Sequence, residues 1–193
     1  MGRLPAPAAP LTALLLAAAL ALPAGAAADP ALWTRLEGGG QVVLIRHAAT
    51  TPGVGDPAGA RLDDCATQRN LSEAGRAEAR RLGAAFRARA VPVGRVLSSP
   101  WCRCLETARL AFGNAEVWEP LRSLFADRSG EVEQTRAFRT LAGARPAGGN
   151  TILVTHGANI LAFVGIHPAP AEMVIVAPRD DGSFTVAGRL PVP

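Results

Sequence analysis

Short β-branched runs alternate with helix-like segments along the chain, and this alternation limits the possible folds more than any other feature. The runs QVVLI at 41–45 and NTILVT at 150–155 have the length and composition of buried strands. Two strands that are joined through a helix usually pair in parallel. We therefore predict an α/β fold, a three-layer sandwich with a mostly parallel central sheet and an antiparallel edge.

Helix signals occupy the gaps between these runs. Ser72 is a suitable N-cap, and the segment 73–90 places small or apolar residues on one face and arginines on the other. Pro100 fits the first turn of a second helix, which we expect to end near Phe112. The other predicted elements are strands at 93–97, 116–118, 172–177 and 183–187, helices at 134–141 and 157–163, and a surface loop at 51–67.

The first residues have the pattern of a secretory signal peptide. Arg3 gives a weakly positive start, and residues 11–22 form an apolar run that is too short to span a bilayer comfortably. Small residues at 26–28 fit a cleavage site. We therefore predict a signal peptide at 1–28, one domain at 29–193, and a periplasmic or secreted protein. The alternative is an uncleaved N-terminal anchor.

The charge pattern excludes one class of partner. All 20 cationic residues are arginine, the formal net charge is only +4, and the chain has no long run of basic residues. These features do not indicate a nucleic-acid partner. No later stretch is apolar for long enough to cross a membrane, so no stable membrane span is expected after signal cleavage.

The chain has three cysteines, Cys65, Cys102 and Cys104, which would meet an oxidising environment after export. We predict a disulfide between Cys65 and one of the other two, either of which is a candidate. The odd cysteine then stays free. A Cys-x-Cys pair can also suggest a metal site. Because no cluster of histidines accompanies it, we expect no metal.

Polar clusters follow three of the predicted strands. Arg46-His47 follows the first strand, Ser98-Ser99 leads to Arg103 after the second, and His156 follows the strand at 150–155. Because parallel strands end at the same edge of a sheet, we expect these clusters to meet in one crevice. Arginine forks and helix N-termini both favour anions, so the crevice is predicted to bind phosphate.

Four ordered segments resemble the histidine phosphatase superfamily, in its phosphoglycerate-mutase-like branch. LIRHAAT at 44–50 resembles the signature that carries the first histidine, and NLSEAG at 70–75 resembles the family's L-[ST]-x-x-G segment. SSPWCRCLETA at 98–108 matches the segment of the second arginine, and VTHG at 154–157 matches that of the second histidine. The resemblance runs from about residue 42 to residue 176 and implies a phosphoglycerate-mutase-like fold.

The resemblance implies a mechanism and a set of residues. His47 would attack phosphorus through one neutral ring nitrogen to give a phosphohistidine, while a backbone carbonyl holds the other nitrogen. Arg46, Arg103 and His156 would bind the phosphate oxygens, with His156 as a cationic donor. The guanidinium groups supply the positive charge, so neither a metal nor another cofactor is expected.

Two positions depart from the family pattern. Ala48 replaces the usual glycine, and Ser123 stands where many members have the glutamate that protonates the leaving oxygen. Asp127 is the nearest carboxylate that could replace this acid, with Glu131 and Glu119 behind it. We interpret His167 as a loop residue.

The predicted function is hydrolysis of a small-molecule or glycan phosphomonoester outside the cytoplasm. One alternative is a catalytically silent anion-binding protein that kept the pocket after losing the acid. Another is a phosphatase of phosphohistidine on proteins, which short family members without the acid resemble; export argues against it.

Overall fold

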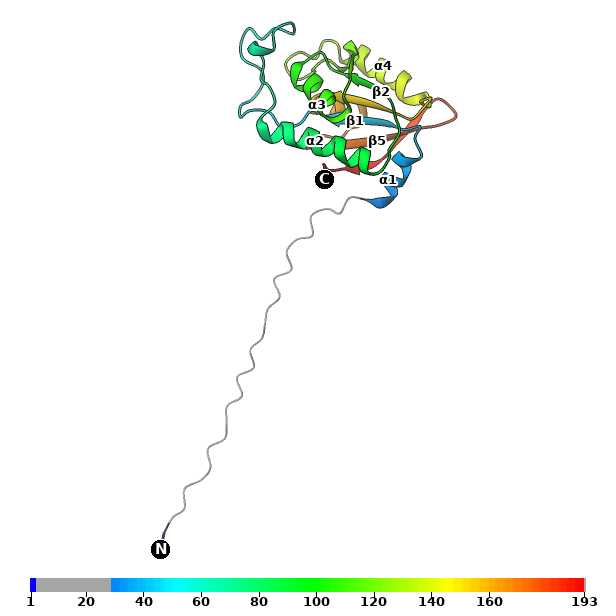
Figure 1. Cartoon of the computed structure of the whole chain (residues 1–193). Helices are drawn as coiled ribbons and strands as arrows, with labels where there is room; N and C mark the ends of the chain where they lie inside the picture. Colours follow the sequence, from blue (N-terminus) through cyan, green and yellow to red (C-terminus); the bar gives the residue numbers. More distant parts are fainter. Residues whose placement is uncertain (3–28, 193) are drawn as a thin grey trace.

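The computed structural model describes residues 1–2 and 29–192, in which helices cover both faces of one six-stranded sheet (Figure 1). The predicted signal peptide at 1–28 lies outside the described residues, apart from the first two. The strands are β1 (Val42–Arg46), β2 (Val93–Ser98), β3 (Glu116–Val117), β4 (Asn150–Thr155), β5 (Met173–Pro178) and β6 (Phe184–Leu190). Their order is β3-β2-β4-β1-β5-β6.

The sheet is parallel from β3 to β1, and β5 and β6 add an antiparallel edge. The predicted fold class is therefore confirmed. The helices are α1 (Pro30–Glu37), α2 (Glu73–Ala88), α3 (Cys102–Phe112), α4 (Glu131–Gly143) and α5 (Gly157–Val164), with short 3-10 turns η1 (Cys65–Thr67) and η2 (Glu119–Leu121). Helix α1 was not predicted from the sequence, although Asp29 caps it and Pro30 begins it.

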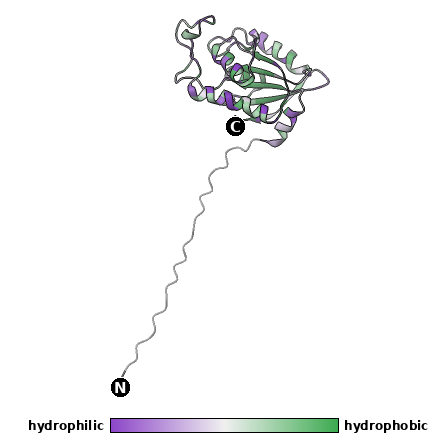
Figure 2. Cartoon of the chain, in the orientation of Figure 1, coloured by the Kyte–Doolittle hydropathy of each residue, from purple (hydrophilic) through white to green (hydrophobic). Residues whose placement is uncertain are grey.

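Both faces of β1 are buried, which explains why its sequence is an unbroken apolar run. Val43 and Ile45 pack in a core under α1, α2 and α3, whereas Val42 and Leu44 pack in a second core under α4 and α5. Figure 2 shows this arrangement as hydrophobic strands between helices with hydrophilic outer sides. The central strands are thus held on both sides, and their ends have fixed positions.

A close approach of backbones ties α2 to the segment that follows β1. A Cβ atom at Gly75 would lie 1.8 Å from the carbonyl oxygen of Ala49, so only glycine fits there. The same carbonyl accepts a hydrogen bond from the amide of Ser72 at 3.0 Å, and the Ser72 hydroxyl caps the helix through the amide of Gly75. The glycine of the NLSEAG segment therefore has a packing role beside the chain that carries His47.

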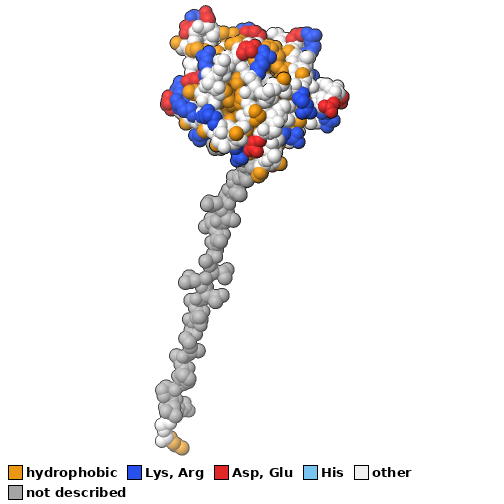
Figure 3. Space-filling view, turned by 45° about the vertical axis from the view of Figure 1, so that its right-hand side comes forward, with side chains coloured by type: hydrophobic (Ala, Val, Ile, Leu, Met, Phe, Trp, Pro, Cys, Tyr) orange, Lys and Arg blue, Asp and Glu red, His pale blue; other side chains and the backbone are white. Residues whose placement is uncertain are grey.

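Charges of both signs alternate on the face of the molecule drawn in Figure 3, where arginines and acidic side chains lie interspersed. This agrees with the modest net charge of the sequence. Among the described residues, no helix has the length and apolar character that a membrane crossing requires.

Candidate active site

The ends of β1, β2 and β4 lie side by side in the sheet and bring the predicted polar clusters to one pocket. The ring centroids of His47 and His156 are 5.3 Å apart. The pocket, here called the inner pocket, has a volume of about 310 Å³. It is lined by Arg46, His47, Gly53, Val54, Gly55, Asp56, Arg69, Arg103, Ser123, Phe125, His156, Gly157, Ala158 and His167.

His47 is held in the form that a nucleophile needs. Its Nδ1 lies 2.9 Å from the carbonyl oxygen of Ala48. A carbonyl only accepts, so Nδ1 carries the proton and Nε2 keeps its lone pair. Burial lowers the pKa of His47 to about 3, aided by the charges of Arg103, Arg46 and Arg69 and opposed by the bond to Ala48. His47 is therefore neutral at neutral pH, as a nucleophile must be.

Three arginines surround this histidine. Arg46 and Arg103 were predicted, and Arg69, at the end of the loop before α2, was missed because nothing in the sequence separates it from the chain's many other arginines. Each of the three has a buried Nε–H group that finds no hydrogen-bond acceptor among the described residues. Buried donors without partners cost free energy. An anion with several acceptor oxygens is the natural partner for a pocket lined by three such guanidinium groups.

Two of these arginines are positioned by carbonyl groups. Arg46 Nη1 donates to the carbonyl oxygen of Pro168 at 2.8 Å, and Arg69 Nη1 donates to that of Gly53. These bonds hold the side chains without neutralising them. Burial, followed by the charge of Arg69, lowers the pKa of Arg46. The charged form of Arg46 is thus less favourable in this pocket than in water.

His156 is buried, and both of its ring nitrogens have neighbours within hydrogen-bond distance. Its Nε2 lies 2.8 Å from the hydroxyl of Ser99, and Arg103 Nη2 lies 3.5 Å from its Nδ1. Burial, then the neighbouring His47 and the arginines, lowers the pKa of His156 well below its ordinary value. The expectation of a cationic His156 is therefore wrong for this structure, because a buried ring beside several cations stays neutral.

The structure does not bring the predicted acid to the inner pocket. Asp127 is exposed, and its Oδ1 accepts a hydrogen bond from the amide of Ser129 at 2.9 Å, which lowers its pKa. Glu131 forms an ion pair with Arg128, and neither Glu131 nor Glu119 lines the inner pocket. A lowered pKa is the opposite of what a general acid needs.

Asp127 and Glu119 instead line a larger adjoining cavity of about 1020 Å³, here called the outer hollow. Its walls come from the loop after β1, from η2 and its following loop, and from α4. The two cavities share four lining residues, Gly55, Asp56, Ser123 and Phe125.

Asp56 is the carboxylate that sequence reasoning missed. Its Oδ1 accepts from Arg103 Nη1 at 2.8 Å and from the amide of Arg69 at 3.0 Å. The prediction of a surface loop at 51–67 is wrong for this residue, whose side chain is only 16% exposed. Gly53 and Gly55 both have positive φ values, 134° and 71°, and turn the loop back over the pocket. The two glycines just before Asp56 were the sequence feature that could have indicated a tight turn toward the pocket.

His167 also lines the inner pocket, although it was interpreted as a loop residue. It is exposed and follows α5. A Cβ atom at position 157 would lie 2.7 Å from His167 Nε2, so the ring sits directly over Gly157. The inner pocket therefore contains three histidines rather than the two predicted.

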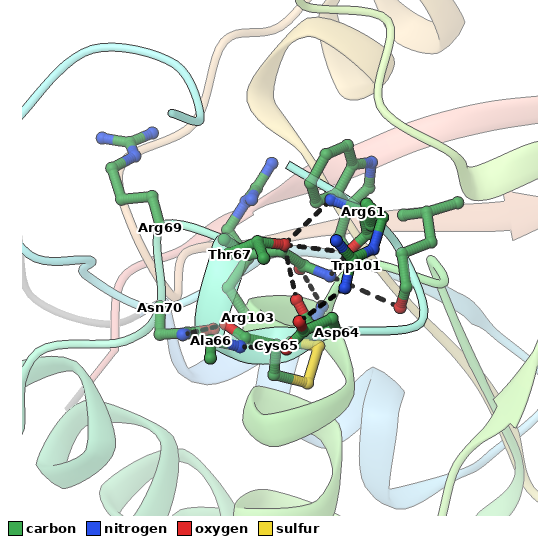
Figure 4. The surroundings of a disulfide bond; sticks show 12 residues. Arg61, Asp64, Cys65, Ala66, Thr67, Arg69, Asn70, Trp101 and Arg103 are labelled. Atoms are coloured by element: carbon green, nitrogen blue, oxygen red, sulfur yellow. Dashed lines mark hydrogen bonds and ion pairs between the residues drawn. A yellow bond between two sulfur atoms is a disulfide. The ribbon is translucent and has the colours of Figure 1, made fainter. Parts of the chain in front are cut away.

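The predicted disulfide is present and joins Cys65 to Cys102, while Cys104 is free and buried. Figure 4 shows this bond between the loop that contains η1 and the start of α3, close to Trp101 and Arg103. The side chain of Gln68 reinforces the link, because its Oε1 accepts from the Cys102 amide at 2.9 Å. The loop of Asp56 and the helix of Arg103 are thus joined covalently. Among the described residues, no three His, Cys, Asp or Glu side chains gather as metal ligands do.

Comparisons with known proteins give one matching family model and several solved structures with a similar fold. The model of the histidine phosphatase superfamily (branch 1) matches residues 42–133. A mutant phosphoserine phosphatase from Entamoeba histolytica in complex with phosphoserine superposes with a TM-score of 0.58 at 13% identity, over 79% of this chain and 97% of that one. No curated protein matches the chain.

Two further solved structures share the fold at 18% identity and a TM-score of 0.51. One is the protein histidine phosphatase SixA complexed with tungstate, over 78% of this chain and 96% of that one. The other is a mycobacterial glucosyl-3-phosphoglycerate phosphatase, over 77% and 97%. At these identities the likeness shows the fold. The family model and the four ordered motifs that meet in one pocket show that the chain is similar to the histidine phosphatase superfamily, branch 1, over residues 42–133.

Proposed function

We propose that the chain is an exported phosphatase that hydrolyses a phosphomonoester through a phosphohistidine on His47. The observation that carries this proposal is the state of that histidine. Its Nδ1–H is fixed by the Ala48 carbonyl, and its Nε2 lone pair remains available in a pocket lined by three arginines. A neutral, oriented nucleophile beside several cations is suited to attack on a phosphate dianion.

The reaction has two steps. In the first, Nε2 of His47 forms a bond to phosphorus and the bond to the ester oxygen breaks, so the alcohol leaves after gaining a proton. In the second, water attacks the phosphohistidine, inorganic phosphate is released and neutral His47 returns. Arg46, Arg69 and Arg103 stabilise the oxygens of the transferred group without moving far, because their positions are already fixed.

The two cavities divide the substrate between them. The inner pocket, with about 310 Å³, accommodates a phosphate group, and the outer hollow, with about 1020 Å³, offers room for a leaving group as large as a sugar. These sizes support a small-molecule or glycan phosphomonoester as the substrate.

Two features support export. Residues 1–28 have the pattern of a signal peptide, and Cys65 pairs with Cys102. Disulfides persist in oxidising compartments and are rare in the cytosol. A periplasmic or secreted location is tested by fractionation together with thiol counting. The exported protein should have one free thiol when denatured, whereas three free thiols in an extract from the envelope would contradict export in oxidised form.

Trapping of the intermediate tests the mechanism. Rapid quenching with radiolabelled substrate should leave label on the wild type that is stable to alkali and released by acid, as expected for a phosphoramidate. Label that is stable to acid and lost in alkali would identify another nucleophile and exclude the proposal. Chelators should leave turnover unchanged, because the charge in the pocket is supplied by arginines.

A second candidate function is the dephosphorylation of phosphohistidine on a protein. Val54 and Phe125, which line the inner pocket, are exposed by 89% and 61%, so the rim offers apolar contacts for a protein segment. A comparison of kcat/KM for a phosphohistidine-bearing protein and for a sugar phosphate distinguishes the two. A catalytically silent binding protein would turn over neither, nor an aryl phosphate.

A further inference from the structure

Asp56 occupies a position that no other carboxylate shares within the described residues. It is the only acidic residue that lines the inner pocket, and it also lines the outer hollow. His47 lines the inner pocket but not the outer hollow. Asp56 therefore lies on the boundary between the cavity that holds the nucleophile and the larger cavity beyond it.

This boundary is where the leaving oxygen belongs. In phosphoryl transfer the attacking atom and the leaving oxygen lie roughly in line, on opposite sides of phosphorus. With His47 on the inner wall and the room for the alcohol in the outer hollow, the bond that breaks points from the inner pocket toward the outer hollow. Asp56 stands beside that path, whereas Asp127 lines only the outer hollow.

The hydrogen bonds of Asp56 leave one oxygen available. Oδ1 accepts from Arg103 and from the Arg69 amide, and no hydrogen bond from the described residues reaches Oδ2. The Arg103 pair holds the carboxylate in place, and its side chain is largely buried. A positioned oxygen within reach of a reacting group is the first requirement for proton transfer.

The proton that the leaving oxygen needs comes from solvent and is taken up when the substrate binds. A phosphate dianion that binds to Arg103 competes with Asp56 for the same guanidinium and places negative charge beside the carboxylate. Neighbouring like charges favour protonation of one of them. Binding of substrate thus draws Arg103 away from Asp56 and leaves this carboxyl group beside the leaving oxygen.

We propose that Asp56 is the general acid and base of the reaction, an inference that rests on the proposed function. Protonated Asp56 gives its proton to the ester oxygen as the phosphorus–oxygen bond breaks. The resulting carboxylate then accepts a proton from the water that attacks the phosphohistidine, so the proton balance closes over one turnover. This role replaces the glutamate for which Ser123 is substituted.

Dependence on the leaving group tests this role. The value of kcat/KM covers the steps up to formation of the phosphohistidine and excludes its later hydrolysis. It is measured for glycerol phosphate, a poor leaving group that needs a proton, and for p-nitrophenyl phosphate, which does not. Asp56→Asn should lower the first value by about 100-fold or more, the scale of general acid catalysis, and the second by no more than a few-fold.

Two further variants control this experiment. Asp63→Asn removes a carboxylate from the same loop, where Asp63 is 85% exposed and pairs with Arg61, and should change neither value. Asp56→Glu keeps an acid and should restore part of the ratio between the two substrates.

The outcomes separate this inference from the proposed function. Equal losses on both substrates in Asp56→Asn and Asp56→Glu would assign Asp56 a structural or binding role and overturn the inference. An unchanged ratio in Asp56→Asn would overturn it as well, as would a wild type that cleaves only the aryl phosphate. A wild type that cleaves neither substrate, and forms no phosphohistidine, would instead refute the proposed function.

Discussion

The inner pocket and the outer hollow share a wall but are built in different ways. The inner pocket takes His47, His156 and two of its arginines from the ends of β1 and β4 and from α3, all fixed by a core that is buried on both faces of the sheet. The outer hollow is built mainly from loops and from exposed or half-buried residues of α4. Under the proposed function, the chemistry lies on the part fixed by the core, and the leaving group contacts the part that tolerates change.

The largest expected effect is the loss of turnover when the nucleophile of the inner pocket is removed. His47→Ala should lower turnover by ~10⁴-fold or more, because the covalent route is lost with the nucleophile. The fold should survive, since His47 is a strand-end residue outside the main hydrophobic clusters. Steady-state rates measured together with circular dichroism test both statements. Substantial turnover in a folded His47→Ala protein would move the chemistry out of the inner pocket.

The second effect concerns the charges of the inner pocket. Arg46→Ala and Arg103→Ala should each reduce kcat by about 100-fold or more, the scale for one preorganised donor in such a site. Lysine should restore little activity, because an ammonium group cannot present two donors in one plane. Arg103→Ala also frees Asp56 from its ion pair, so it should be the more damaging of the two. Wild-type rates in Arg103→Ala would show that the observed pocket does not bind the substrate.

A smaller effect on kcat/KM is expected from a substitution in the wall that the inner pocket and the outer hollow share. Phe125 is 61% exposed and lines both cavities, so Phe125→Ala removes apolar contact area from the leaving group. The value of kcat/KM for a bulky phosphomonoester should fall by about three- to tenfold, the scale of a partial loss of apolar burial. Inhibition by inorganic phosphate should not change. A stronger effect on phosphate than on the bulky ester would mean that the two cavities are not divided as we infer.

The smallest effect is on stability at mildly acidic pH. The pKa of His47 is lowered to about 3, so between pH 6.5 and 3 the unfolded chain binds a proton that the folded chain does not. The contribution of His47 to the free energy of unfolding is therefore full above pH 6.5. It falls as the pH decreases toward 3, by at most about 1.4 kcal/mol per pH unit. Denaturant unfolding at pH 7.5 and 5 should show a smaller loss for His47→Gln than for the wild type. An equal loss in both proteins would contradict a neutral His47.

The sequence was sufficient to predict the parts of the site that follow strands. His47 and His156 are placed by β1 and β4, whose apolar runs are local signals, and Arg103 follows from a helix start next to β2. The parallel sheet then brings these positions together. The site residues that depend on loops could not be obtained in this way.

The position of Asp56 in the pocket depends on interactions with residues that are distant in the sequence. Its position depends on two left-handed glycines, on an ion pair with a helix 47 residues further along the chain, and on a disulfide. Asp127 shows the opposite case, because closeness in sequence to Ser123 did not indicate the direction of its side chain. The amide of Ser129 holds that carboxylate in a local turn, and Asp127 does not line the pocket of His47.

The disulfide has a consequence for how the chain matures. Three cysteines allow three single bonds, and only the bond from Cys65 to Cys102 is native. A bond to Cys104, two residues further along the helix, would require α3 to rotate by about 200° and would turn Arg103 away from phosphate. In the folded chain, burial raises the pKa of the Cys104 thiol to about 12, which keeps it unreactive toward exchange. The native pairing must therefore be selected during oxidation, before folding encloses Cys104.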